Sequence, residues 1–126
     1  MTPPRRPVYL NLFRIHLPVM AWVSILHRVS GALLALAFPL AVWALAVSLA
    51  DEAGYARLAA TFDFVPAKLV VLGLVWALTH HYFAGLRHLA LDLHWGLARA
   101  QARRISFAVL GLTAFVTVVA AWRLFV

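Results

Sequence analysis

The chain has 126 residues, of which 65% are hydrophobic and only 12% are charged, and its formal net charge at pH 7 is +7. A soluble domain carries charge on roughly a quarter of its residues, so this composition excludes an ordinary water-soluble domain and predicts a protein solvated by lipid. The absence of cysteine excludes disulfides, thiolate zinc sites and cysteine-bound iron–sulfur clusters within this chain.

The first 20 residues are predicted to form an arm without regular structure, because Pro3, Pro4 and Pro7 oppose both helix and sheet. The first long apolar run starts only after residue 28 and is longer than the core of a secretory signal. We therefore expect a retained membrane segment and no cleaved leader.

Three apolar runs without Lys, Arg, Asp or Glu follow the arm, at 29–50, 69–86 and 105–122. A helix of about 20 residues crosses a hydrocarbon core roughly 30 Å thick, and a spanning segment must be helical to satisfy its own backbone groups. The chain is thus predicted to be an all-α membrane protein, a single domain over 1–126. Its three transmembrane helices are expected at about 21–50, 66–92 and 105–125. The connection 51–65 is polar, and 93–104 resembles a short interfacial helix.

The basic residues are distributed unevenly between the two ends of these helices. Most of them lie before the first span or around the second connection: Arg5, Arg6, Arg14, Arg28, Arg87, Arg99, Arg103 and Arg104. Only Arg57, Lys68 and Arg123 lie at the opposite ends. Since Lys and Arg collect in cytoplasmic loops, we expect a cytoplasmic N-terminus and a C-terminus on the outer, periplasmic side. The net charge is then mainly a topology signal, and a nucleic-acid partner is not expected.

The first helix carries a polar stripe where it enters the membrane. Ser24, His27, Arg28 and Gly31 fall on one face at helical spacing, with a glycine that lets another group approach closely. A hydroxyl, an imidazole and a guanidinium together are suited to hydrogen-bond a quinone carbonyl or to pair with a carboxylate. The alternative interpretation makes Arg28 a topology anchor that reaches the lipid headgroups.

The second helix carries a longer stripe formed by His81, Gly85, His88 and Asp92. An imidazole at the depth of His81 has few roles: a hydrogen bond between helices, a proton relay, or an axial bond to haem iron. His81 and His88 are roughly 10 Å apart along one helix, so they cannot flank one iron. A haem ligated by His81 would need its second ligand from another chain, which predicts an obligate partner in the membrane.

Both stripes are predicted to lie in the inner leaflet. A haem bound through His81 would turn its propionates toward the basic groups His27, Arg28 and His88. A quinone head group would then sit beside Ser24 and Arg28. This hypothesis accounts for several intramembrane polar residues together, whereas the alternatives must explain each one separately.

The two stripes resemble the cytochrome b membrane-anchor subunit of succinate dehydrogenase, the respiratory complex II. The resemblance covers nearly the whole chain and rests on Arg6-Pro7, Ser24-Ile25-Leu26-His27-Arg28-Val29-Ser30-Gly31 and His81-x-x-x-Gly85-Leu86-Arg87-His88-x-x-x-Asp92. It implies that His81 is the axial ligand of one haem b, with the other ligand supplied by a second anchor subunit. Alignment through Gly85 selects His81 rather than its neighbour His80.

The resemblance also implies that Ser24 and Arg28 contact ubiquinone, and that His27, Arg28 and His88 lie near the haem propionates. The partners would be the second anchor, an iron–sulfur subunit and a flavoprotein subunit, the latter two on the cytoplasmic face of a bacterial inner membrane. Electrons from succinate would pass through them to ubiquinone, so the chain alone is not expected to be an enzyme.

Three other functions remain open from the sequence. One is the anchor of a fumarate reductase, which runs the same chemistry in reverse. Another is a small transport or proton-relay subunit using His81 and Arg28, and a third is a purely structural scaffold. A transporter of cations should carry an acidic residue deep in a span, but every acidic residue lies outside the apolar runs: Asp51, Glu52, Asp63 and Asp92.

Overall fold

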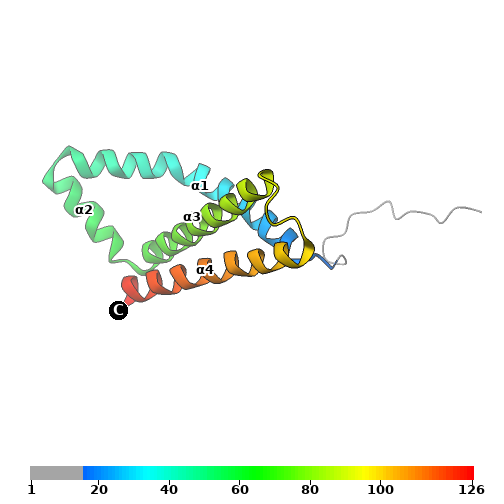
Figure 1. Ribbon diagram of the computed structural model, residues 1–126. Coiled ribbons are helices and arrows are strands. Elements are labelled where there is room, and N and C mark those ends of the chain that lie inside the picture. Colours follow the sequence, from blue (N-terminus) through cyan, green and yellow to red (C-terminus); the bar gives the residue numbers. More distant parts are fainter. Residues whose placement is uncertain (1–15) are drawn as a thin grey trace, which may run out of the picture.

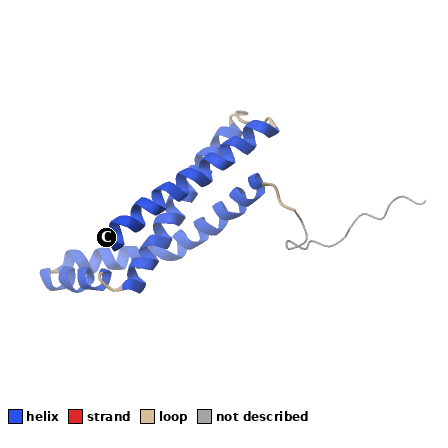
Figure 2. Cartoon of the chain, turned by 90° about the horizontal axis from the view of Figure 1, so that it is seen from below, coloured by secondary structure: helices blue, strands red, loops and turns tan. Residues whose placement is uncertain are grey.

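The computed structural model describes residues 16–126, and this part of the chain is built from α-helices joined by short turns, with no strand (Figures 1 and 2). The helices are α1 (Val19–Ala50), α2 (Glu52–Phe62), α3 (Val65–Asp92) and α4 (Arg99–Phe125). The arm is predicted over 1–20; its prolines and the Arg6-Pro7 motif lie in 1–15, outside the described residues, whereas Val19 and Met20 already belong to α1.

The three long helices α1, α3 and α4 are each long and apolar enough to cross a membrane. The predicted all-α architecture with three candidate spans is thereby confirmed. Proline marks two of the helix starts, where a missing backbone N–H is harmless. Pro18 precedes α1 and accepts a backbone bond from Ala21 at 2.9 Å, and Pro66 lies in the first turn of α3.

The second connection differs from the short interfacial helix that the sequence suggested. Residues 93–98 form a turn, and the arginines that follow belong to the first turns of α4. His94 and Gly96 both have positive φ, at 60° and 85°, which interrupts a right-handed helix. A side chain at Gly96 would also meet Ile105 Cδ1 at 2.9 Å, so this turn packs directly under α4.

The first connection is more ordered than a polar loop, because it contains α2. Asp51 starts that helix: its Oδ1 accepts a hydrogen bond from the Gly54 amide at 2.5 Å. A carboxylate at this position satisfies one of the free N–H groups of the first turn and favours the positive end of the helix dipole. The chain therefore turns from α1 into α3 through an 11-residue helix.

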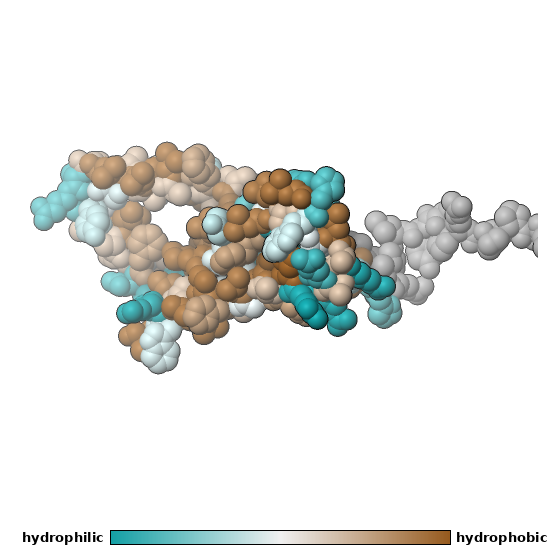
Figure 3. Space-filling model, viewed as in Figure 1, coloured by the Kyte–Doolittle hydropathy of each residue, from teal (hydrophilic) through white to brown (hydrophobic). Residues whose placement is uncertain are grey.

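The interior is narrow and holds small or polar side chains. α3 packs against both α1 and α4, while the C-terminal half of α1 diverges from it and α2 leads back (Figure 1). The buried residues are Val23, Ala77, Ala84, Ala102 and Val109, together with the polar Ser30, His80, Arg87, Ser106 and Thr113. Large apolar side chains point outward, and hydrophilic ones gather at the two ends of the molecule (Figure 3). This inverted distribution is the one expected of helices that pack in lipid.

Candidate functional site

The His81 imidazole of α3 lies against α1, where its orientation is fixed by contacts with His27. The two rings are stacked, with centroids 4.2 Å apart and planes at 9°. Nδ1 of His81 lies 3.1 Å from the backbone carbonyl oxygen of His27. A carbonyl oxygen only accepts, so Nδ1 carries the proton and Nε2 keeps its lone pair. This is the tautomer that a metal-ligating histidine adopts when its second nitrogen donates to a carbonyl.

Ser30 belongs to the same contact, although the sequence reasoning did not single it out. Its side chain is fully buried, and its hydroxyl donates to the His27 carbonyl at 2.9 Å. The hydroxyl oxygen lies 3.5 Å from Nδ1 of His81. The position of Ser30, three residues after His27 and so about one turn along the same face of α1, was the sequence signal that indicated this contact.

Gly31 provides the close approach expected of it, and the group that approaches is His81. A Cβ at this position would stand 2.8 Å from Cε1 and 3.2 Å from Nδ1 of the imidazole. Such a contact is too short for any side chain, so the ring rests directly on the α1 backbone. Gly85 is less constrained, because a Cβ there would lie 3.5 Å from Nε2 of His27, an ordinary contact.

His88 extends the group to three imidazoles. Its ring centroid lies 5.0 Å from that of His27, with the planes at 45°. We refer to His27, His81 and His88 as the histidine cluster. No set of three or more His, Cys, Asp or Glu side chains within 16–126 is arranged to hold a metal ion by itself. The cluster is therefore not a protein-only metal centre, but it presents one imidazole suited to a single axial bond.

Ser24 and Arg28 lie one turn apart on α1, at the end of the helix nearest the turn between α3 and α4. Ser24 is half-buried and Arg28 is exposed. The structure thus brings the histidines of α1 and α3 together and leaves the Arg28 guanidinium at the surface. Asp92 is the exposed last residue of α3.

His80, the neighbour of His81, contacts α1 one turn earlier. It is fully buried, and its Nε2 lies 3.3 Å from the carbonyl oxygen of Val23. Its ring stacks over Trp76, with centroids 5.7 Å apart and planes at 16°. The two consecutive histidines therefore bond to two carbonyls of the same helix, and only His81 joins the cluster.

Arg87 is the residue whose place differs most from the sequence interpretation. The sequence pattern predicts a charge that reports topology, yet only 8% of Arg87 is exposed, and its Nε has no hydrogen-bond partner among the described residues. It occupies the same inward stripe of α3 as His80 and Ala84. Helical spacing from His80 was the signal that would have placed it there.

Known proteins resemble the chain over almost its full length. Residues 2–121 match the family described as the succinate dehydrogenase/fumarate reductase transmembrane subunit. The chain is 35% identical over 118 residues to the succinate dehydrogenase cytochrome b556 subunit of Coxiella burnetii, a match that covers 93% of this chain and 94% of that protein. It is 32% identical to the subunit of the same name from Paracoccus denitrificans, over 83% of this chain and 81% of that protein. The mitochondrial cytochrome B subunit of Schizosaccharomyces pombe is 34% identical, over 79% of this chain and 58% of that protein.

Proposed function

The chain belongs to the family of succinate dehydrogenase and fumarate reductase transmembrane subunits, and we propose that it helps its complex bind one haem b and reduce ubiquinone. As a multi-pass membrane anchor of this family it works within a complex rather than as an enzyme by itself. The named relatives are succinate dehydrogenase subunits, which favours succinate oxidation over fumarate reduction as the direction. Two of them are named cytochrome b556, which supports a b-type haem.

The hydrogen bond between His81 and the His27 carbonyl is the observation that carries the haem proposal. It holds the proton on Nδ1 and leaves Nε2 free to ligate iron, while the stacked His27 ring and Gly31 prevent the imidazole from turning. One imidazole supplies one axial bond, so the second ligand comes from a second anchor subunit. When bound, haem b supplies one-electron transfer within the membrane.

The remaining site residues have roles in charge pairing and in orientation. His27 and His88 lie beside His81, and the exposed Arg28 follows His27 on α1, so these residues would donate hydrogen bonds to the propionate carboxylates. Ser24 and Arg28 would bind and orient the quinone head group through its carbonyl oxygens. In this proposal both groups lie in the inner leaflet, with the N-terminus cytoplasmic and the C-terminus periplasmic, as the excess of basic residues at that end supports. The iron–sulfur and flavoprotein subunits would dock on the cytoplasmic face of the bacterial inner membrane.

The direct test is the reduced-minus-oxidised absorbance spectrum of the intact complex. We expect His81→Leu to abolish or strongly shift the b-type signal, because His81 is the imidazole of the histidine cluster whose Nδ1 is held by a carbonyl while its Nε2 is left to ligate iron. His80→Leu is the matched control, since it removes the adjacent imidazole while leaving His81 and its carbonyl contact in place. A normal spectrum in His81→Leu, with the signal lost in His80→Leu, would move the ligand to His80. Normal spectra in both variants would remove the chain from the haem.

A further inference from the structure

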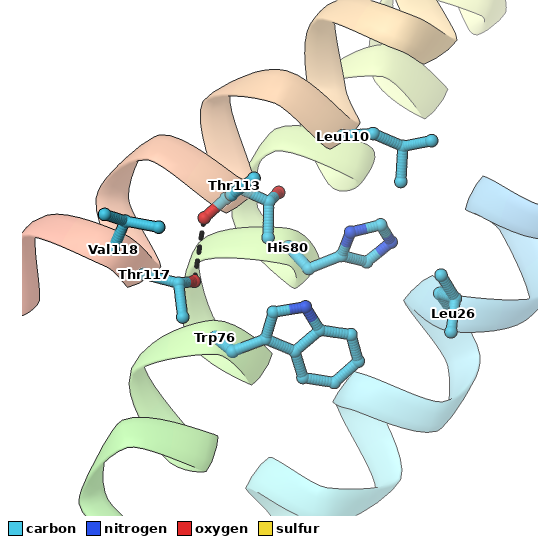
Figure 4. A pocket seen from close by; sticks show the side chains of 8 residues that line it. Leu26, Trp76, His80, Leu110, Thr113, Thr117 and Val118 are labelled. Carbon is cyan, nitrogen blue, oxygen red and sulfur yellow. Dashed lines mark hydrogen bonds between the residues drawn. The ribbon is translucent and has the colours of Figure 1, made fainter. Parts of the chain in front are cut away.

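A pocket separate from the histidine cluster lies between α1, α3 and α4 (Figure 4). Its volume is about 310 Å³. The side chains that matter for its chemistry are Leu26 of α1, Trp76 and His80 of α3, and Leu110, Thr113 and Thr117 of α4. Hydrocarbon therefore forms most of the wall, with one imidazole, one indole N–H and two hydroxyls set into it.

The His80 imidazole faces this pocket with an unpaired nitrogen. The residue is fully buried, and Nδ1 has no hydrogen-bond partner among the described residues. The other nitrogen, Nε2, lies 3.3 Å from the carbonyl oxygen of Val23 and must carry the proton to bond there. In the neutral ring, which a low-dielectric interior favours, Nδ1 is then a lone-pair acceptor. Buried acceptors in folded proteins are almost always paired, so this nitrogen calls for a donor.

The other polar atoms of the pocket do not supply that donor. The Trp76 indole stacks on the His80 ring with the planes at 16°, and its N–H is not bonded to Nδ1. The Thr113 hydroxyl donates to the Val109 carbonyl at 2.8 Å. The Thr117 hydroxyl donates to the Thr113 carbonyl at 2.7 Å, the bond drawn in Figure 4. Both hydroxyl protons are thus used within α4, and each oxygen retains lone pairs that accept. No carboxylate lines this part of the described chain, so a cation would find no counter-charge there.

We propose that this pocket binds a neutral guest whose O–H group donates a hydrogen bond to Nδ1 of His80. Two sources share this chemistry: water, and a membrane-dissolved alcohol or phenol. A water molecule occupies about 30 Å³ of liquid, so the volume admits about ten waters or a ring-sized molecule. The site is independent of the haem proposal, because His80 is not in the histidine cluster and its partner carbonyl belongs to a different turn of α1.

The test uses crystals of the intact complex soaked with 4-bromophenol or with bromobenzene, which has the same ring without the hydroxyl. In the wild type we expect either anomalous bromine density in the pocket with the phenol oxygen on Nδ1, or an ordered water on Nδ1 that 4-bromophenol does not displace. The first result identifies an organic guest and the second identifies water. Bromobenzene is expected to bind about tenfold more weakly than 4-bromophenol, the effect of losing one hydrogen bond.

His80→Phe keeps a ring at this position but removes the acceptor, so the phenol or the water should be lost from it. The reduced-minus-oxidised spectrum of the His80→Phe complex shows whether that complex has assembled. The comparison of the 4-bromophenol and bromobenzene soaks in the wild type does not depend on the variant. Three results would overturn the proposal. They are a protein side chain donating to Nδ1, a closed pocket with Nδ1 still unpaired, and equal binding of both bromo compounds with and without His80.

Discussion

The imidazole of His81 is confined by backbone as much as by side chains. The His27 carbonyl accepts its Nδ1 proton, and the Gly31 Cα leaves no room for a methyl group beside it. The sequence reasoning predicted a close approach at Gly31 and a buried role for His81. It missed Ser30, because a serine in an apolar helix is usually bonded to its own backbone and carries no further signal.

Gly31→Ala should therefore disturb the haem without touching a ligand. The new Cβ would stand 2.8 Å from Cε1 of His81, so the ring must move away from α1 and its bond to the His27 carbonyl must lengthen. Loss of such an orienting contact lowers metal affinity by about ten- to a hundredfold. We expect lower haem content and a shifted midpoint potential, measured by redox titration of the purified complex.

Three other glycines serve as graded controls for that substitution. A Cβ at Gly73 or Gly111 would meet nothing within 4 Å, and one at Gly85 would make only an ordinary contact with His27. Haem content should therefore be unchanged in Gly73→Ala and Gly111→Ala and nearly unchanged in Gly85→Ala. An equal loss in all four variants would mean that helix glycines matter for assembly in general and not for the His81 contact.

At the scale of the elements, apolar length and proline positions predicted the three spans, whereas the connections required three-dimensional information. The helix α2 begins with a side-chain cap from Asp51, and the turn after α3 has His94 at positive φ, a conformation that residues other than glycine seldom adopt. The burial of Arg87 depends on the neighbouring helices. The amino-acid composition shows that Arg87 is charged but not which face of α3 it occupies.

Asp51→Ala should loosen α2 while leaving the three spans intact. The substitution removes the acceptor of the Gly54 amide, which costs about 1 kcal/mol for a typical N-cap. Hydrogen exchange of the first turn of α2, followed by mass spectrometry, should accelerate roughly fivefold, while Asp51→Asn should retain most of the protection.

Asp63→Ala is the matched control for charge, because it removes an acidic residue from the other end of α2, where the backbone N–H of Asp63 makes the cap. Its exchange in the first turn should equal that of the wild type. The same acceleration in both variants would assign the effect to charge rather than to capping.

For the molecule as a whole, the side chains that bury one another are too few and too small to hold the helices together alone. Within residues 16–126, the buried apolar side chains are two valines and three alanines, while residues such as Leu36, Phe38 and Leu49 are largely exposed. Hydrocarbon covers such surfaces in a membrane, so association depends on close packing and polar contacts with further helices. The sequence reasoning predicted an obligate partner from the missing second ligand, and the sparse interior supports that expectation independently.

Expression without the second anchor should lower the amount of this chain in the membrane several-fold and eliminate the haem signal. The physical reasons are the uncovered helix faces and the single axial imidazole. Immunoblots of membranes with and without the second anchor, read beside their reduced-minus-oxidised spectra, measure both effects. Equal abundance together with a six-coordinate haem in the chain alone would contradict this prediction.

The consecutive histidines of α3 have a mechanical consequence. His80 bonds to the carbonyl of Val23 and His81 to that of His27, so α1 is attached to α3 at two points one turn apart. A shift of α1 by one residue in register combines a rise of about 1.5 Å with a rotation of about 100°, and it would break both attachments together. The N-terminal half of α1 can then neither slide along α3 nor rotate against it without breaking these bonds. Ser24 lies between Val23 and His27, the two attachment points on α1. Its hydroxyl therefore moves together with α3 as part of one rigid unit.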